Sequence, residues 1–306
     1  MNKRQIGNSN LYVSEVSLGA MSLGTDENQA RTIVDQALAA GINYIDTADL
    51  YDFGENEKIV GKAIQGRRDE LILGTKVGNN FDAENKDWHW DASKSHIKSG
   101  VKDSLQRLGV DYIDLYQLHG GKIEDNIDEA IEAFDELKKD GLIREYGISS
   151  IRPNVIREYA KRSDIVSVMM QYNALDRRPE EEMLDFLAEH HISVLARGPL
   201  AKGMLSNRAV EKTKQKATNG FLDYSYEEMM TMIEKWEAFQ SPERPLNALA
   251  LQYVLHHPTV ATAVFGASSP EQLVENLSFL NAAPLTDELY SSIQNVTRPI
   301  TYHQHR

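Results

Sequence analysis

The sequence predicts an α/β protein that folds as a (β/α)8 barrel of the TIM-barrel class, with extra helices late in the chain. Short apolar runs alternate with longer amphipathic segments along its 306 residues. Strands that alternate with helices pair in parallel through right-handed crossovers, and eight such units close into a barrel. The turn after the first strand reads GAMSLG, not G-x-G-x-x-G, which disfavours the alternative of an open, doubly wound sheet.

Eight short apolar segments are the expected strands of this barrel. They cover residues 13–19, 43–46, 71–76, 112–119, 143–149, 166–173, 192–197 and 260–266. Amphipathic segments follow them, and the expected helices cover residues 27–40, 55–65, 93–108, 126–139, 153–161, 179–190 and 270–281. After the seventh strand the chain is expected to continue as a long loop.

Two connections are longer than a simple barrel needs. Residues 78–93 are expected to form a long loop that carries Trp88, His89 and Trp90. Residues 198–224 form the second long connection. Both segments exceed the basic plan of a (β/α)8 barrel.

Additional helices are expected late in the chain. Residues 226–240 have helical periodicity and precede the apolar segment 245–257. Residues 286–296 begin with a threonine cap and also show helical periodicity, which predicts a helix outside the barrel. No Pro/Gly/Ser-rich linker divides the chain, so residues 1–306 are expected to form one barrel domain.

Composition limits the function classes. The net charge of −13 repels phosphate backbones, so a general nucleic-acid binder is not expected. The chain has no cysteine, which excludes disulfides, thiolate metal sites and cysteine nucleophiles. No signal-like apolar run follows the N-terminus, and no stretch approaches the ~20 apolar residues of a membrane helix. We therefore expect a cytoplasmic protein without a membrane or nucleic-acid partner, as a monomer or small homo-oligomer.

Ionisable side chains end three consecutive expected strands. Asp46, Lys76 and His119 each follow a buried run, and Tyr51 lies in the loop after Asp46. Each has an ordinary alternative: Asp46 as a turn residue, Tyr51 as a packing residue and His119 as a core histidine. Lys76 is harder to explain in that way, because lysine is rarely buried unpaired. Their joint occurrence where a barrel places its active site favours a catalytic role.

Chemistry gives the four side chains one task. A phenol with its ordinary pKa of about 10 is a poor acid at neutral pH, and a nearby ammonium makes it a better one. A carboxylate keeps the lysine charged, and a histidine can polarise a carbonyl oxygen. The set supplies a proton to a carbonyl but lacks a nucleophile, so a cofactor must bring the hydride. No metal site is expected, since His119 is the one histidine at a strand end.

These residues resemble the aldo-keto reductase family, and the resemblance covers essentially the whole chain. The stretch DTADLYDFGENEKIVGKAI (46–64) is similar to the family's strand-two signature. LGTK (73–76), DLYQLH (114–119) and GISS (147–150) follow in order at the family's positions. The motifs LYQLH and ARGPLAKGML most resemble those of the bacterial aryl-alcohol-dehydrogenase-like members.

The resemblance implies an enzyme and its catalytic residues. It carries over Asp46, Tyr51, Lys76 and His119 as the catalytic tetrad. The implied reaction is the NAD(P)H-dependent reduction of aldehydes or ketones to alcohols by hydride transfer, with Tyr51 as the general acid. Some relatives of the family act as channel-associated subunits that bind the cofactor as a sensor. A regulatory subunit with little turnover is therefore the alternative, although the intact tetrad favours an enzyme.

The resemblance also implies a nicotinamide cofactor site. Ser149 and Ser150 match the pair that holds the carboxamide, with Ser150 in place of the family's Asn, and Gln171 serves the same group. The full set of expected cofactor-binding residues is Gly19, Met21, Ser149, Ser150, Gln171, Arg197, Gly198, Pro199, Leu200, Lys202, Gly203, Gly266, Ser268, Gln272, Glu275 and Asn276.

Arg197 departs from the family pattern. It occupies the position of a tyrosine whose ring stacks on the nicotinamide, and a planar guanidinium can stack there too. Its positive charge is expected to disfavour the oxidised, cationic ring. Lys202 and the backbone that precedes it are expected to meet the pyrophosphate.

The adenosine end of the implied site lies in GASSPEQLVEN (266–276). Members that prefer NADPH place Lys or Arg there for the 2′-phosphate, and this chain has none in that stretch. A charged partner would then come from elsewhere, such as Arg208 or Lys202. NADPH is the expected cofactor, and NADH is possible.

A small-molecule carbonyl compound is the expected partner. Phe53, Trp88 and Trp90 are candidates to line an apolar substrate pocket. Packing within the loop is an equally good explanation of the two tryptophans. The sequence does not name the substrate.

Overall fold

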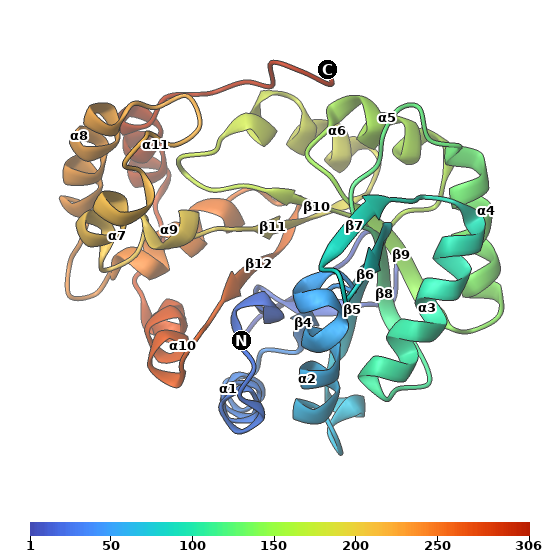
Figure 1. Ribbon diagram of the computed structural model, residues 1–306. Helices are drawn as coiled ribbons and strands as arrows, with labels where there is room; N and C mark the ends of the chain where they lie inside the picture. Colours follow the sequence, from blue (N-terminus) through green and yellow to red (C-terminus); the bar gives the residue numbers. More distant parts are fainter.

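The structure, a computed structural model that describes residues 1–306, contains a closed barrel of eight parallel strands (Figure 1). Around the barrel the order is β10-β11-β12-β3-β4-β5-β8-β9. The strands are β3 (Val16–Gly19), β4 (Tyr44–Asp46), β5 (Ile72–Val77), β8 (Ile113–Leu118), β9 (Ile143–Ser149), β10 (Ser167–Gln171), β11 (Ser193–Arg197) and β12 (Val260–Gly266). The predicted fold class is confirmed.

The helices surround the barrel in the predicted order. Those that follow the first six strands are α1 (Glu27–Ala39), α2 (Glu55–Ala63), α3 (Lys94–Leu108), α4 (Ile127–Lys139), α5 (Pro153–Arg162) and α6 (Met183–Glu189). Those late in the chain are α7 (Ala209–Lys216), α8 (Tyr226–Glu237), α9 (Leu246–Leu255), α10 (Pro270–Leu277) and α11 (Asp287–Val296). None of the helices has the combination of length and apolar composition that a membrane crossing requires.

The helix expected over residues 179–190 is shorter than predicted. Its first part is the separate 3-10 turn η4 (Arg178–Glu181), and the α-helix begins at Met183. The turn holds Glu180, whose carboxylate accepts hydrogen bonds from the hydroxyls of Tyr172 and Tyr253. The part of the predicted helix that is lost thus holds a largely buried carboxylate with two tyrosine partners.

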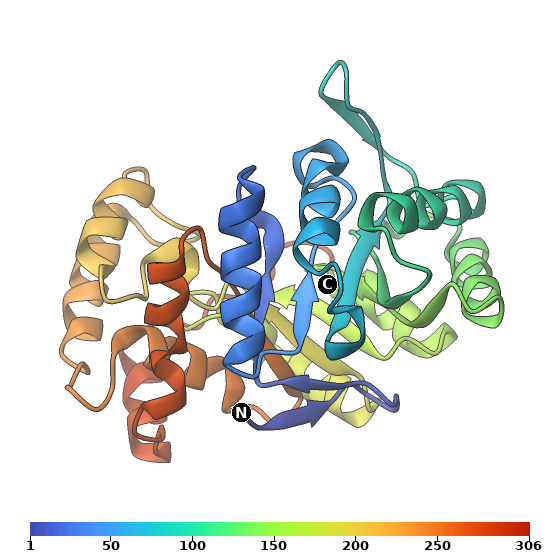
Figure 2. The same ribbon diagram turned by 90° about the horizontal axis from the view of Figure 1, so that it is seen from below.

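The first expected strand divides into two. β2 (Tyr12–Ser14) pairs antiparallel with β1 (Lys3–Gln5), and only β3 joins the barrel. Glu15 separates β2 from β3 and forms an ion pair of 2.9 Å with Arg4. The β1–β2 hairpin lies across one end of the molecule, away from the opposite end where β6 and β7 project (Figure 2).

The two long connections contain regular structure that the sequence did not predict. Residues 78–93 form the antiparallel hairpin of β6 (Asn79–Asp82) and β7 (Asp87–Trp90). Asp82 Oδ1 accepts from the backbone N–H of Glu84 and Asn85, which stabilises the turn of the hairpin. The connection after β11 contains α7, which packs against α8.

Two apolar cores position the site. The larger one, of 73 buried residues, lies mainly between the outer faces of the strands and the helices. A smaller cluster of nine, including Tyr44, Leu115, Met169 and Leu195, fills the barrel interior. The ionisable residues at the carboxyl ends of the strands therefore lie above an apolar interior.

Candidate active site

A buried ion pair between Lys76 and Asp46 forms the centre of the site. Asp46 ends β4, and Lys76 lies on β5, its neighbour in the barrel. Lys76 Nζ lies 2.6 Å from Asp46 Oδ2, 2.6 Å from the Thr47 carbonyl and 3.3 Å from the Tyr51 hydroxyl. An ammonium has three N–H donors, so these partners hold the fully buried lysine in one orientation.

Electrostatics keep Lys76 charged. Burial by itself would lower the pKa of Lys76, but the charge of Asp46 and the hydrogen bonds to Asp46 and Tyr51 outweigh it and raise the pKa above its usual value. The second oxygen of Asp46 is also bonded. It accepts from the Tyr44 hydroxyl at 3.0 Å and from the Gln117 amide at 3.2 Å. Both oxygens of this buried carboxylate therefore have partners.

A tight turn after β4 presents Tyr51. The 3-10 turn η2 (Tyr51–Gly54) follows the strand, and α2 begins directly after it. Asp52 (φ 49°) and Phe53 (φ 53°) both adopt the left-handed conformation. This conformation costs a non-glycine residue about 1–2 kcal/mol, so the sharp turn is maintained by its surroundings.

His119 directly follows β8 and faces the phenol. Its ring centroid lies 5.8 Å from that of Tyr51, with the two planes at 82°. Burial, together with the positive charges of Lys76 and Arg197, lowers the pKa of His119 to about 3. The imidazole is therefore neutral at neutral pH and still has one N–H to donate. The structure thus brings together all four side chains that the sequence singled out.

A cavity of about 700 Å³, lined in part by Asp46 and Tyr51, opens beside this group. All of the residues expected to bind the cofactor line it, except Ser149 and Ser150. Ser149 ends β9 and Ser150 follows it, and both are buried beside Met169 of β10. The cavity is large enough for a sizeable small molecule.

Arg197 contributes a cation without a counter-charge. It ends β11 beside Gln171 of β10, and its Nη1 donates to Gln171 Oε1 at 3.2 Å. Gln171 in turn donates to Asp176 Oδ2 at 2.9 Å. Arg197 takes part in none of the ion pairs of the structure, and burial lowers its pKa. The guanidinium is available to a ligand in the cavity.

A row of three cations lines another part of the cavity. Arg208, Lys212 and Lys216 lie on α7 or directly before it, and their spacing places them on one face. Arg208 and Lys216 form no ion pair, and the contact between Lys212 and Glu211 is long, at 4.0 Å. Sequence reasoning considered Arg208 but missed the two lysines. The repeat of basic residues at every fourth position was the available signal.

The aromatic residues expected at a substrate pocket do not line this cavity. The Trp90 indole donates to the carboxylate of Asp125 at 2.9 Å and 3.1 Å, so it anchors the hairpin. Trp88 is 51% exposed. Phe53 packs edge-on against Phe81 of the hairpin, with the ring centroids 6.0 Å apart. A contact of these rings with substrate stays a prediction.

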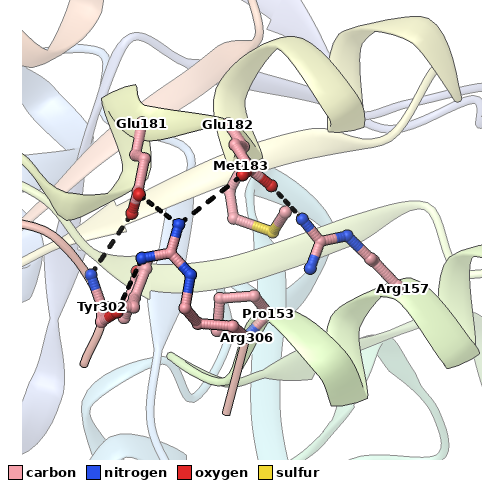
Figure 3. Close-up of a pocket in the computed structure, with 7 residues that line it drawn as sticks. All are labelled: Pro153, Arg157, Glu181, Glu182, Met183, Tyr302 and Arg306. Carbon is pink, nitrogen blue, oxygen red and sulfur yellow. Dashed lines mark hydrogen bonds and ion pairs between the residues drawn. The ribbon is translucent and has the colours of Figure 1, made fainter. Parts of the chain in front are cut away.

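The C-terminal segment is tied to the same end of the barrel. It runs from α11 past the top of the molecule toward α5 and α6 (Figure 1). Arg306 donates to Glu181 at 2.5 Å and to the Tyr302 carbonyl at 3.1 Å, beside a small hollow (Figure 3). The Tyr302 ring packs on Arg178, which binds Asp176 through two hydrogen bonds of 2.7 Å. The tail thus contacts the network that holds Gln171.

Comparison with known proteins identifies the family of the chain. Residues 15–298 match the Aldo/keto reductase family. The chain belongs to this family. It is 54% identical to the "Uncharacterized oxidoreductase YqkF" of Bacillus subtilis (strain 168), over 100% of both chains. It is 29% identical to the "NADH-specific methylglyoxal reductase" of Escherichia coli (strain K12), over 92% of this chain and 94% of that protein.

A solved structure of the family is very similar. The holo form of the aldo-keto reductase AKR11C1 from Bacillus halodurans has a TM-score of 0.93 and 55% identity, and the match covers 100% of this chain and 99% of that one. The aldo/keto reductases are oxidoreductases that use nicotinamide cofactors. The cavity of this aldo/keto reductase fits such a dinucleotide, because it has unpaired cations for phosphates and a polar end beside Tyr51.

Proposed function

We propose that this aldo/keto reductase reduces aldehydes or ketones to alcohols with NADPH, and that Tyr51 is the general acid. The observation that carries the proposal is the 3.3 Å contact between Lys76 Nζ and the Tyr51 hydroxyl at the wall of the cavity. A fixed ammonium beside a phenol stabilises the phenolate that remains after the proton has left.

Each member of the tetrad has a defined role in this proposal. When bound, the reduced nicotinamide supplies the hydride. Tyr51 gives its proton to the carbonyl oxygen as that oxygen becomes an alkoxide. Lys76 stabilises the resulting phenolate, and Asp46 holds Lys76 charged and in place. The neutral His119 donates a hydrogen bond to the same carbonyl oxygen and so fixes its position.

The cation row supports NADPH as the cofactor. A 2′-phosphate adds up to two negative charges, and Arg208, Lys212 and Lys216 face the cavity without strong partners. Ser268 and Gln272 line the same cavity from the start of α10. Arg197 and Gln171 would then lie at the nicotinamide end, near Tyr51. The Escherichia coli relative is named as NADH-specific, so the preference within the family varies and has to be measured.

A cofactor-binding sensor with little turnover is the alternative function. The complete tetrad disfavours it, because a sensor has no need of a proton donor held beside a charged lysine. The test is a turnover assay of the purified chain with NADPH and a panel of aromatic aldehydes. Catalytic consumption of NADPH with formation of the alcohol supports the enzyme. Tight cofactor binding without turnover on any carbonyl substrate would support the sensor.

We further propose that residues 1–306 form a single barrel domain, that the protein is cytoplasmic, and that it is a monomer or a small homo-oligomer. We also propose that Ser149 and Ser150 approach the carboxamide only when the cofactor is bound, since they lie just outside the cavity lining.

A further inference from the structure

A tyrosine stands beneath the ion pair inside the barrel. Tyr44 lies two residues before Asp46 on β4, so both side chains point to the same face of the strand. Tyr44 is fully buried in the apolar interior cluster, and its hydroxyl donates to Asp46 Oδ1 at 3.0 Å. Gln117 donates to the same oxygen at 3.2 Å. Asp46 is thus held on the side away from Lys76.

The neighbouring strand makes room for this hydroxyl. Gly74 of β5 pairs with Asp46 of β4. A Cβ atom at Gly74 would lie 2.4 Å from the Tyr44 hydroxyl oxygen, so any larger residue would displace it. Phenylalanine would fill an apolar layer without the cost of burying a polar atom. The position of the phenol and the glycine opposite it therefore point to a function for the hydroxyl.

We propose that Tyr44 is a positioning residue for the reduction, whose hydroxyl holds Asp46 in line with Lys76 and so keeps Lys76 beside Tyr51. This inference rests on the proposed function, in which Tyr51 is the acid. By donating to Asp46, Tyr44 takes up part of the carboxylate's negative charge. Asp46 then draws the ammonium proton of Lys76 less strongly, and more positive charge stays next to the phenol.

The electrostatics agree with a donor role. Burial, followed by the negative charge of Asp46, raises the pKa of Tyr44 well above its usual value, so the hydroxyl keeps its proton. The titratable groups facing the tetrad come from several elements. Besides the tetrad itself, they are Tyr44 on β4, the buried Asp49 in the turn after β4 and Arg197 on β11.

The chain offers a matched control for the test. Tyr116 is also fully buried, on the nearby strand β8, but its hydroxyl has no hydrogen-bond partner. Tyr44→Phe and Tyr116→Phe therefore both remove one buried hydroxyl, and only the first removes a donor to Asp46. The readout is the pH profile of kcat/KM for aldehyde reduction, which a loss of stability alone does not move.

We expect Tyr44→Phe to lower kcat about tenfold and to move the alkaline limb of the profile upward by about 0.5–1 pH unit, because less positive charge stabilises the phenolate. Tyr116→Phe should leave the limb in place. Gln117→Met removes the other donor to Asp46 and should move the alkaline limb in the same direction; it serves as the test variant if Tyr44→Phe does not fold. The proposal is overturned if the alkaline limb of the test variant coincides with that of the wild-type enzyme.

A second readout needs neither cofactor nor substrate. Urea unfolding of Tyr44→Phe, Asp46→Asn and the double variant gives the coupling between the two residues. We expect the double variant to lose less stability than the sum of the two single losses. Additive losses would contradict a direct action of Tyr44 on Asp46. Failure of the proposed function is recognised separately, because Tyr51→Phe would then retain activity whatever Tyr44 does.

Discussion

Lys76 Nζ and Asp46 Oδ2 are 2.6 Å apart, and the two side chains are 0% and 5% exposed. Water therefore screens this ion pair very little, and each charge depends on the other. Removal of one partner from such a pair leaves an uncompensated charge, whereas removal of both leaves an apolar gap. The pair can thus be tested for stability and for catalysis separately.

Asp46→Asn should lower the free energy of unfolding by about 3–5 kcal/mol, because the buried ammonium of Lys76 loses its counter-charge. The double variant Asp46→Asn/Lys76→Met should recover part of this loss and remain inactive. Urea unfolding and a reductase assay check both statements. If the single and the double variant have the same free energy of unfolding, the counter-charge of Lys76 is not what stabilises this part of the barrel.

His119 should make the protein less stable as the pH falls. Its pKa is about 3 in the folded protein against an ordinary value of 6.5, so between these values the unfolded chain binds a proton that the folded chain does not. Well above pH 6.5 the residue has almost no effect on stability, because His119 is then neutral in both states. At pH 5 the loss amounts to about 2 kcal/mol, at 1.36 kcal/mol per unit.

The measurement is the pH dependence of urea unfolding for wild type and His119→Gln, which cannot be protonated. The variant should lose about 2 kcal/mol less than wild type between pH 7 and pH 5. Parallel curves for the two proteins would mean that His119 gains a proton in the folded state as readily as in the unfolded chain.

Arg197 should affect the two redox states of the cofactor differently. If its guanidinium lies over the nicotinamide, it disfavours the oxidised, cationic ring. Arg197→Tyr should then raise the affinity for the oxidised form relative to the reduced form by about tenfold, or on the order of 1–2 kcal/mol. Both dissociation constants can be measured by quenching of tryptophan fluorescence. An equal loss of affinity for the two forms would instead place Arg197 at the pyrophosphate.

The cation row should favour NADPH over NADH. Lys212→Ala combined with Lys216→Ala should weaken NADPH binding about tenfold or more and NADH binding much less, since only NADPH carries the 2′-phosphate. Lys214→Ala is the matched control, because Lys214 is exposed on the same helix and does not line the cavity. If both cofactors lose affinity to the same extent, the lysines serve a phosphate that the two cofactors share.

The barrel and its central residues could be predicted because they depend on local patterns. Asp46, Lys76 and His119 lie at or directly after the carboxyl ends of adjacent strands, and in a parallel barrel these ends meet on one side. Short apolar runs define the strand ends closely. The convergence of the three side chains therefore follows from the order of the elements alone.

Other parts of the site depend on tertiary contacts that no local pattern specifies. Tyr44 looks like an ordinary strand residue, and its bond to Asp46 becomes visible only with Gly74 beside it. The segment before α8 reads as a polar connection, although α7 within it places Lys212 and Lys216 toward the cavity. The polar hairpin that carries Trp90 also lacks a strong strand signal, and its pairing emerges from the turn at Asp82.

Tyr51→Phe is the most direct test of the proposed chemistry, because it removes one hydroxyl and leaves the ring, the turn and the cavity in place. With reduction of an aromatic aldehyde as the assay, kcat should fall by about 10²–10⁴-fold or more, as expected for the loss of a general acid. The dissociation constant for NADPH should stay close to that of wild type. A Tyr51→Phe protein that reduces the aldehyde at nearly the normal rate would contradict the assignment of Tyr51 as the proton donor.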